Sequence, residues 1–408
     1  MPMNSELKPQ IRFKGFTDDW EQRKLGEIGK AISGIGFPEK EQGGDKGIPF
    51  YKVSDMNNAG NEREMYNSNN YVTNEQITKN HWNVICDVPA ILFAKVGAAV
   101  MLDRKRLCRF PFLLDNNSMT FVFDKNKLDN EYSKALFDTI YLPSLIQVGA
   151  LPSYNAPQVE GIDIIIPKIE EQKDIGNIFK QIDNLITLHQ RKCDKLVELK
   201  KSLLEKMFPQ NNSVIPEIRF KGFTDDWEQR KLGDISTFKQ GNQVDLDKQY
   251  NDFNNERIRF IRIVDYTQNT DDIRYIDKNF TNNVIDKKDV IIVRYGATAG
   301  FVGRGITGVL ANNMFTVNPD KSLTREYLYT YLKQEKIYKK LNNSNGSSAM
   351  PALNFGTVKA LEIVYPNNVE QLKIEVLFNN IDNLITLYQR KHDKLNKIKQ
   401  SLLNDMFV

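Results

Sequence analysis

The chain has 408 residues, more than one hydrophobic core usually organises, so at least two domains are expected. Hydrophobic residues make up 40% and charged residues 26%, and no run of 18 apolar residues occurs, which excludes a disordered, fibrous or membrane-spanning chain. The net charge of +4 is compatible with nucleic acid without indicating it, and three scattered cysteines with no leader-like start favour a reduced, cytoplasmic protein.

The first recognisable element is a block of 18 residues that occurs twice. Ile11–Ile28 reads IRFKGFTDDWEQRKLGEI, and Ile218–Ile235 matches it at 17 of 18 positions. An offset of 207 residues is too long for a solenoid repeat, so one large unit is used twice. Trp20 and Trp227 lie in this shared block, and we expect them to anchor a core or a domain junction rather than to stack on a base.

Each copy of this block is followed by a segment that differs between the halves, over roughly residues 29–160 and 236–360. Short β-rich runs and a helical stretch predict a compact α+β domain in each half. The expected strands are Ile91–Ala94, Met119–Phe123, Ile162–Ile166, Val290–Arg294 and Leu361–Tyr365, and the expected helices are Glu131–Leu142 and Arg325–Leu341.

Weak similarities survive inside the dissimilar segments. LFAKVGAAV around Gly97 resembles IVRYGATAG around Gly296, and LPSYNAPQVEGIDIIIP from Leu151 resembles MPALNFGTVKALEIVYP from Met350. The two glycines are expected to permit a tight backbone turn. We therefore predict one fold that carries two different surfaces.

A second repeated block closes each half. Phe179–Phe208 and Phe378–Phe407 match at 20 of 30 positions, and no Pro or Gly interrupts 177–207 or 371–406. Apolar residues at alternating steps of four and three predict long coiled-coil helices, each a rod on the order of 50 Å. The predicted seam contains Ile175, Ile178, Ile182, Leu185, His189, Lys192, Leu196, Leu199 and Leu203 in the first helix, and Ile374, Leu377, Ile381, Leu384, Tyr388, Lys391, Leu395, Ile398 and Leu402 in the second.

Further apolar residues widen both seams. They are Phe179, Ile186, Leu188 and Leu204 in the first helix, and Phe378, Ile385, Leu387 and Leu403 in the second. A two-stranded coiled coil needs only the seam, so the wider stripe indicates an additional packing partner. That partner is either a domain of this chain or a helix of another protein.

The order of these elements predicts the organisation of the chain. We expect domains at residues 1–166 and 209–365, and helical spacers at 167–208 and 366–408. The start of the chain duplicates the junction at the end of the first helix, so the end of the second helix is expected beside the N-terminal block. The predicted fold is α+β: two pseudo-twofold-related α/β domains separated by a pair of long antiparallel coiled-coil helices.

The usual motifs of DNA-modifying and nucleotide-hydrolysing enzymes do not occur in the sequence. There is no N-P-P-Y motif, no G-x-x-x-x-G-K-[ST] loop and no nuclease-type carboxylate–lysine set. Of the three histidines, His189 aligns with Tyr388 and His392 with Cys193, so neither is shared between the halves. We therefore expect neither a metal site nor independent catalysis.

The repeated blocks resemble the specificity subunits of type I restriction–modification enzymes. Trp20–Ile28 and Trp227–Ile235 are similar to the start of a target-recognition domain in that family, and Asp183–Leu196 and Asp382–Leu395 are similar to its helical spacers. The resemblance implies that each domain reads one half of an asymmetric, split DNA target and that the helices set the gap. It also implies two adenine methyltransferase subunits and two ATP-dependent restriction subunits as partners, with S-adenosylmethionine, ATP and Mg on those partners and no cofactor on this chain.

Candidate DNA-contacting residues were sought among basic and polar side chains in the segments that differ between the halves, because such side chains bind phosphates and base edges. They are Tyr51, Lys52, Lys95, Arg104, Lys105 and Arg106 in the first half, and Arg259, Arg262, Arg294, Tyr295, Thr298 and Arg304 in the second. Two other functions stay open on the sequence alone. One is a standalone bipartite DNA-binding regulator or anti-restriction adaptor, and the other is a structural coiled-coil adaptor.

Overall fold

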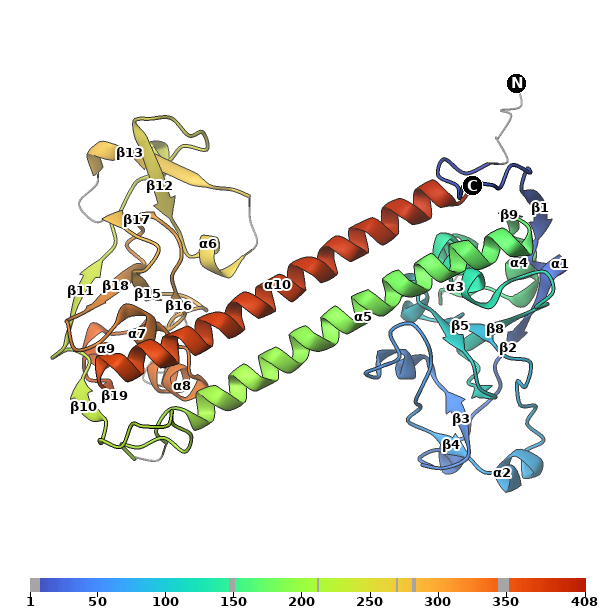
Figure 1. Cartoon of the computed structure of the whole chain (residues 1–408), viewed down its shortest axis with the longest axis horizontal. Helices are drawn as coiled ribbons and strands as arrows, with labels where there is room; N and C mark the ends of the chain where they lie inside the picture. Colours follow the sequence, from blue (N-terminus) through green and yellow to red (C-terminus); the bar gives the residue numbers. More distant parts are fainter. Residues whose placement is uncertain (1–7, 147–150, 211–212, 269–270, 281–283, 344–351) are drawn as a thin grey trace. The chain divides into compact units, whose positions relative to one another are not determined.

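The computed structural model describes residues 8–146, 151–210, 213–268, 271–280, 284–343 and 352–408 (Figure 1). The chain divides into two units, the first formed by Met1–Lys192 with Tyr388–Val408 and the second by Cys193–Leu387. Each unit holds one mixed α/β domain and a part of each of two long helices. The α+β class expected from the sequence, with two repeated domains and two long helices, is confirmed.

The first unit contains three small sheets, with strand orders β2-β8-β5-β6, β4-β3-β7 and β1-β9. The strands are β1 (Glu21–Lys24), β2 (Gly29–Ser33), β3 (Ile48–Tyr51), β4 (Tyr71–Val72), β5 (Ala90–Ala94), β6 (Lys105–Cys108), β7 (Leu113–Leu114), β8 (Ser118–Phe123) and β9 (Asp163–Ile166). The helices of this domain are α1 (Leu25–Ile28), α2 (Asn74–Lys79), α3 (Asn130–Thr139) and α4 (Ala156–Glu160).

The second unit repeats this plan, with strand orders β11-β18-β15-β16, β13-β12-β17-β14 and β10-β19. Its strands are β10 (Glu228–Lys231), β11 (Ser236–Gln240), β12 (Arg257–Ile261), β13 (Arg274–Asp277), β14 (Val284–Ile285), β15 (Val290–Val293), β16 (Val302–Gly303), β17 (Gly308–Leu310), β18 (Met314–Pro319) and β19 (Glu362–Tyr365). Its helices are α6 (Val264–Thr267), α7 (Arg325–Leu332), α8 (Glu335–Asn343) and α9 (Phe355–Lys359).

The interior strands of the two larger antiparallel sheets explain the apolar runs in the sequence. β5 reads AILFA and β15 reads VIIV, and all of their residues are buried. A strand that is covered on both faces needs a continuous apolar run rather than alternation. Together with α3 and α7, these strands form the centre of each domain core.

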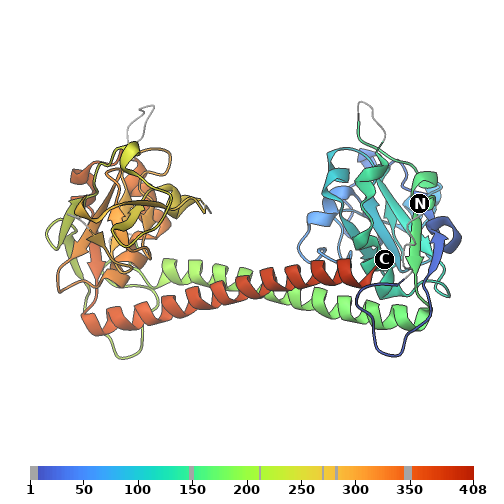
Figure 2. The same cartoon turned by 90° about the horizontal axis from the view of Figure 1, so that it is seen from above.

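The two long helices are α5 (Ile169–Lys206) and α10 (Asn368–Met406), with 38 and 39 residues (Figure 2). Equivalent glutamines fix their first turns to the preceding strand. Gln172 Nε2 donates to the Pro167 carbonyl and Gln371 Nε2 to the Pro366 carbonyl, at 2.9 and 2.8 Å. No helix among the described residues combines the length and apolarity required to cross a membrane.

The helices run antiparallel where they pack together within each unit. In the first unit, Lys399 Nζ lies 2.8 Å from an Asp183 carboxylate oxygen, and the rings of His189 and Tyr388 are 5.5 Å apart. As residue numbers increase along α5, the residues of α10 that they contact therefore have decreasing numbers. In the second unit, Lys200 pairs with Asp382 at 2.5 Å, and Phe208 packs on Phe378 further along, with ring centroids 6.0 Å apart.

The predicted seam was wrong at three positions of each long helix. Leu185 and Leu199 are 44% and 47% exposed, Leu384 and Ile398 are 41% and 39% exposed, and Lys192 and Lys391 also face solvent. At each of these three points in each helix, the buried or half-buried residue is instead the one that directly follows the predicted residue. The buried and half-buried positions of the seam are residues 179, 186, 193 and 200 of α5 and residue 207 directly after it, with 182, 189, 196 and 203 between them, and residues 378, 385, 392, 399 and 406 of α10 with 381, 388, 395 and 402 between them.

The residues predicted for the seam and its flanks therefore differ in their exposure. Phe179, Phe378 and Ile381 are buried, and the half-buried residues are Ile178, Ile182, Ile186, Leu196, Leu377, Ile385 and Leu395. The exposed apolar residues Leu185, Leu199, Leu384 and Ile398 lie beside the seam. Apolar side chains at adjacent helix positions gave two possible heptad registers, and the sequence did not distinguish them.

Each domain core is completed by the end of a long helix. Phe407 packs edge-on against Trp20 in the first unit, with ring centroids 6.3 Å apart, and Phe208 packs in the same way against Trp227 in the second, at 6.4 Å. Both tryptophans are buried. They act as core anchors, as the sequence predicted.

Candidate nucleic-acid interface

The dissimilar segments of the two halves contain equivalent basic positions at the ends of equivalent strands. Lys95 follows β5, and its backbone N–H donates to the Asn117 carbonyl at 2.8 Å. Arg294 follows β15, and its backbone N–H donates to the Asn313 carbonyl at 2.8 Å. The sequence similarity around these two residues therefore reflects one backbone arrangement.

A tight turn after each basic residue requires glycine. Gly97 has φ of 83° and Gly296 has φ of 91°, in the region that L side chains rarely adopt. The residue before each glycine forms an isolated bridge to a second loop, Val96 to Ser153 and Tyr295 to Ala352. Met350, from which the similarity in the second half was counted, lies outside the described residues.

The two equivalent basic side chains have different surroundings. Arg294 Nη1 donates to Gln240 Oε1 at 3.1 Å, and its guanidinium lies 4.8 Å from the ring centres of both Tyr295 and Phe355. Lys95 is half-buried, and burial lowers the pKa of its ammonium group, which is partly offset by Asp115. The two domains therefore share a fold but carry different basic residues, Lys95 and Arg294, after their equivalent strands.

A second group of candidate residues lies within β12 and directly after β3 and β12. Lys52 Nζ donates to Gln42 Oε1 at 3.1 Å. Arg259 Nη2 donates to Asp265 at 2.9 Å, and Arg262 Nη1 lies 3.2 Å from Asp272. These basic groups are half-buried and oriented by polar partners.

Two candidate residues are buried and not free to contact DNA, and a third, half-buried, is bound to a long helix. Tyr51 is 3% exposed, and its hydroxyl donates to the Met65 carbonyl inside the core. Lys105 is also 3% exposed and pairs with Asp103 at 2.6 Å. Arg304 donates from Nη2 to Asn379 Oδ1 at 3.0 Å, and its guanidinium lies 4.2 Å from the centre of the Tyr329 ring, so it attaches the domain to α10.

The other candidates lie on turns or strand edges of the same segments. Arg104 Nη1 donates to Asn57, and Arg106 pairs across from Leu92 between β5 and β6. Thr298 is half-buried in the turn after Gly296, where its carbonyl accepts from the Phe301 N–H at 2.9 Å. Their contact with DNA stays a prediction.

Residues that orient the basic groups were missed from the sequence. Gln240 holds Arg294, and the side chain of Asp265, which is 1% exposed, holds both Arg259 and Arg262. An acidic residue three positions after Arg262 was the available signal. An acidic side chain at a DNA interface acts through the basic groups it orients, so residue type alone does not mark it as functional.

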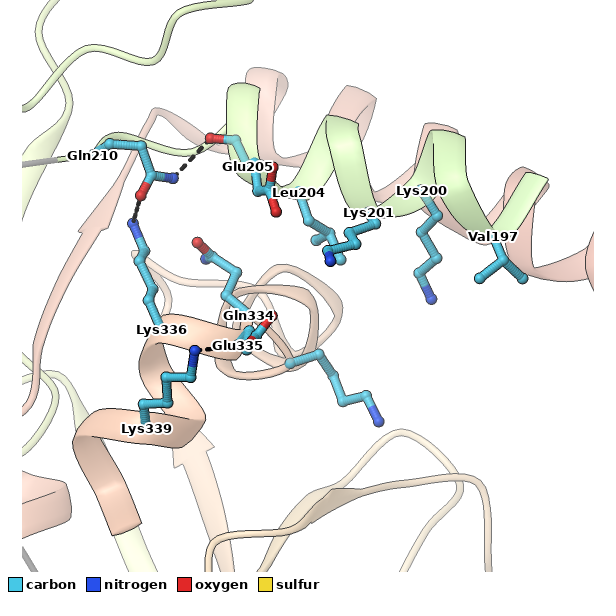
Figure 3. A pocket seen from close by; sticks show the side chains of 11 residues that line it. Val197, Lys200, Lys201, Leu204, Glu205, Gln210, Gln334, Glu335, Lys336 and Lys339 are labelled. Atoms are coloured by element: carbon cyan, nitrogen blue, oxygen red, sulfur yellow. Dashed lines mark hydrogen bonds and ion pairs between the residues drawn. The ribbon is translucent and has the colours of Figure 1, made fainter. Parts of the chain in front are cut away.

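The second unit also contains a lysine-lined cavity of about 580 Å³ between α5 and α8 (Figure 3). Val197 and Leu204 contribute apolar surface, and Lys336 Nζ donates to the Pro209 carbonyl at 2.5 Å and to Gln210 Oε1 at 3.1 Å. Lys333 lines the same cavity, and no carboxylate of the described residues lies within ion-pair distance of it. Among the described residues, no cluster of His, Cys, Asp and Glu is arranged to hold a metal ion.

Comparisons with known proteins agree with this repeated architecture. A family model described as type I restriction modification DNA specificity domain matches residues 17–198 and again 224–397. The putative type I restriction enzyme MjaX specificity subunit of Methanocaldococcus jannaschii is 25% identical over 267 residues, which are 62% of this chain and 60% of that protein. The type I restriction enzyme MjaVIII specificity subunit of the same organism is 22% identical over 287 residues, which are 65% of each protein.

A solved structure shares the fold. The crystal structure of the type I restriction-modification system S subunit from M. genitalium aligns with a TM-score of 0.62 at 14% identity, covering 98% of this chain and 99% of that chain. The matches to the two curated relatives span less than two thirds of their lengths. The two family-model matches, by contrast, cover well over half of the present sequence, and the chain therefore belongs to the type I restriction modification DNA specificity domain family.

Proposed function

We propose that this chain is the DNA-specificity subunit of a type I restriction–modification complex. Each of its two domains reads one half of an asymmetric, bipartite DNA target. The observation that carries the proposal is the double occurrence of the specificity-domain match, at 17–198 and 224–397, on domains that share a fold and differ in their basic groups. Two domains that share a fold but differ in their basic residues are suited to a DNA target whose two halves differ in sequence.

The chemistry is assigned to partner subunits. In the proposal, adenine methyltransferase subunits use S-adenosylmethionine, and restriction subunits use ATP and Mg, while this chain contributes recognition and scaffolding. Methylation of an adenine requires the base to be extruded into a pocket, which a separate subunit supplies. Two copies of each partner fit a chain that has two equivalent halves.

Exposed apolar residues beside the helical seam support two equivalent docking surfaces for such partners. Leu188 on α5 and Leu387 on α10 are exposed and occupy corresponding positions of the repeated block. Leu185 corresponds in the same way to Leu384. Exposed leucines at neighbouring helix positions form a surface that another helix can cover.

The proposal is tested by mapping methylated adenines in a host that expresses the full chain together with the type I methyltransferase subunit of its own system. The expected result is methylation at one asymmetric, split sequence that depends on the presence of this chain. Lys95→Ala and Arg294→Ala serve as a matched pair, because these residues occupy equivalent positions in the two halves. Each substitution is expected to weaken recognition of one half-site and to leave the other unchanged. A methylation pattern that is identical with and without the chain would overturn the proposal.

A further inference from the structure

The ends of β3 and β12 carry a short similarity that the two halves share within their dissimilar segments. FYKVSD from Phe50 and FIRIVD from Phe260 have a basic residue at the third position and Asp at the sixth. Both strands pair in parallel with an equivalent neighbour, β3 with β7 and β12 with β17. The basic residues Lys52 and Arg262 directly follow these strands.

The same hydrogen bond fixes the backbone of both basic residues. The Lys52 N–H donates to Asp55 Oδ2 at 2.7 Å, and the Arg262 N–H donates to Asp265 Oδ2 at 2.7 Å. Both aspartate side chains are almost completely buried. A buried carboxylate is costly unless it is satisfied by hydrogen bonds, so the aspartate and the turn hold one another in place.

A glutamine orients the Lys52 side chain, and an equivalent glutamine occurs in the second half. Lys52 Nζ donates to Gln42, whose Nε2 donates to the Phe37 carbonyl at 2.9 Å. Gln249 makes the corresponding bond in the second half, from Nε2 to the Val244 carbonyl at 2.9 Å. Each of these glutamines follows a single 3₁₀ turn, Glu39–Glu41 in the first half and Leu246–Lys248 in the second.

Arg262 is held more firmly than Lys52. Its Nε lies 3.5 Å from Asp265 and its Nη1 lies 3.2 Å from Asp272. Asp265 also accepts from Arg259 Nη2 at 2.9 Å. Arg262 Nη1 and Nη2 both donate to Asp272, to its carboxylate and to its carbonyl oxygen respectively. A guanidinium that is offset by two carboxylates has little free charge for a phosphate, whereas the second hydrogen on each of its terminal nitrogens, held in a fixed orientation, can bond to a base edge.

We infer that Lys52 and Arg262 are corresponding base-reading positions of the two halves, with Asp55 and Asp265 as the positioning residues behind them. The inference rests on the proposed function, because it names the side chains that read each half-site. The simpler interpretation is that each aspartate only caps a turn. The two interpretations differ in what they predict for the preferred base.

The experiment uses the full chain in complex with its methyltransferase subunit and maps methylated sites for four variants. Arg262→Gln and Asp265→Asn test the second half, and Lys52→Gln and Asp55→Asn are the matched variants in the first. Asparagine at 265 keeps an oxygen for the Arg262 N–H and removes the charge that orients the two arginines. Thermal unfolding of each variant shows whether the fold is retained.

The expected result is loss of preference at one base pair, by about tenfold to a hundredfold, in one half-site only. Arg262→Gln and Asp265→Asn should affect the same base pair, and Lys52→Gln should affect a base pair of the other half-site. Unchanged preference in folded Arg262→Gln and Asp265→Asn variants would overturn the inference. Weaker binding to all sequences alike would also overturn it, because that result indicates a phosphate contact. If the wild-type complex recognises no split sequence, the proposed function fails instead.

Discussion

Arg63 donates from Nε to an Asp183 carboxylate oxygen at 3.0 Å, which attaches the first domain to α5 inside the first unit. The same guanidinium donates to Glu131 at 2.7 Å, and Glu131 also accepts from Arg109 and Lys180. Asp183 pairs in turn with Lys399 of α10. The largely buried network therefore joins the domain to both long helices.

Removal of Arg63 should strongly destabilise the first unit. In an Arg63→Met variant, Glu131 and Asp183 lose a common cation in a largely buried site, and such losses cost about 3–5 kcal/mol. Thermal or denaturant unfolding of the full chain measures the effect. Arg23→Met is the control, because Arg23 pairs with Glu21 at an exposed position, where the expected loss is below about 0.5 kcal/mol. Equal effects of the two substitutions would show that the network does not hold the domain.

The first unit should also lose stability in acid because of Glu131. Burial by itself would raise the pKa of Glu131, but hydrogen bonds from Lys180, Arg63 and Arg109 outweigh it and lower the pKa to about 2. A carboxyl whose pKa is lower in the folded state stabilises the protein above its unfolded pKa, and that stability is lost as the pH falls toward the folded value. We expect the loss between about pH 4.5 and pH 2. Unfolding midpoints measured across this range for wild type and Glu131→Gln should show a shallower pH dependence in the variant.

Two residues of α10 separate packing within the chain from partner binding. Ile381 is 5% exposed, whereas Leu384, three residues further on, faces solvent. Ile381→Asp should lower the stability by several kcal/mol, on the order of 3, because it buries an unpaired charge. Leu384→Asp should change the stability by less than about 0.5 kcal/mol and reduce co-purification with the methyltransferase subunit. Normal co-purification of the Leu384 variant would place the docking surface elsewhere.

Lys333, which directly follows α7, occupies the position in the second unit that Asp138 occupies near the end of α3 in the first. Asp138 pairs with Lys134 and Lys399 in the first unit. In the second unit, burial lowers the pKa of Lys333, and nearby Lys200 lowers it further. Lys333→Asp should restore the arrangement of the first unit and raise the stability by about 0.5–1 kcal/mol. Lys321 and Lys333 are both exposed, but Lys321 does not line the cavity that Lys200 and Lys333 share. Lys321→Asp therefore makes the same charge change away from Lys200 and should have little effect; a lower unfolding midpoint for Lys333→Asp than for this control would contradict the comparison.

The features predicted well from the sequence were those that repetition or local periodicity specifies. The 18-residue block with Trp20, the apolar strand β5 and the long helix α5 each carry a strong local pattern. The heptad register failed because Leu185 and Ile186 are both apolar, and only packing decides which of them is covered. The parallel pairing of β3 with β7 was not predicted, because it joins short strands about 60 residues apart.

The candidate DNA-contacting residues show the same limit. Lys105 is a basic residue in a dissimilar segment, yet Asp103 and the Ile140 carbonyl hold its ammonium group inside the domain. Residue type alone does not distinguish such a buried lysine from Lys52. Asp265 shows the opposite error, since an acidic residue orients two arginines at the candidate interface.

The position of Phe407 in the first core has a consequence for synthesis of the chain. Leu403, Met406 and Phe407 belong to the same core as Trp20, so the first domain lacks part of its interior until these residues of the chain have been synthesised. The second unit is continuous from Cys193 to Leu387 and has no such requirement. The domain that contains Trp20 is therefore completed only after the whole second unit has been synthesised, and a premature stop before Leu403 would remove part of its core.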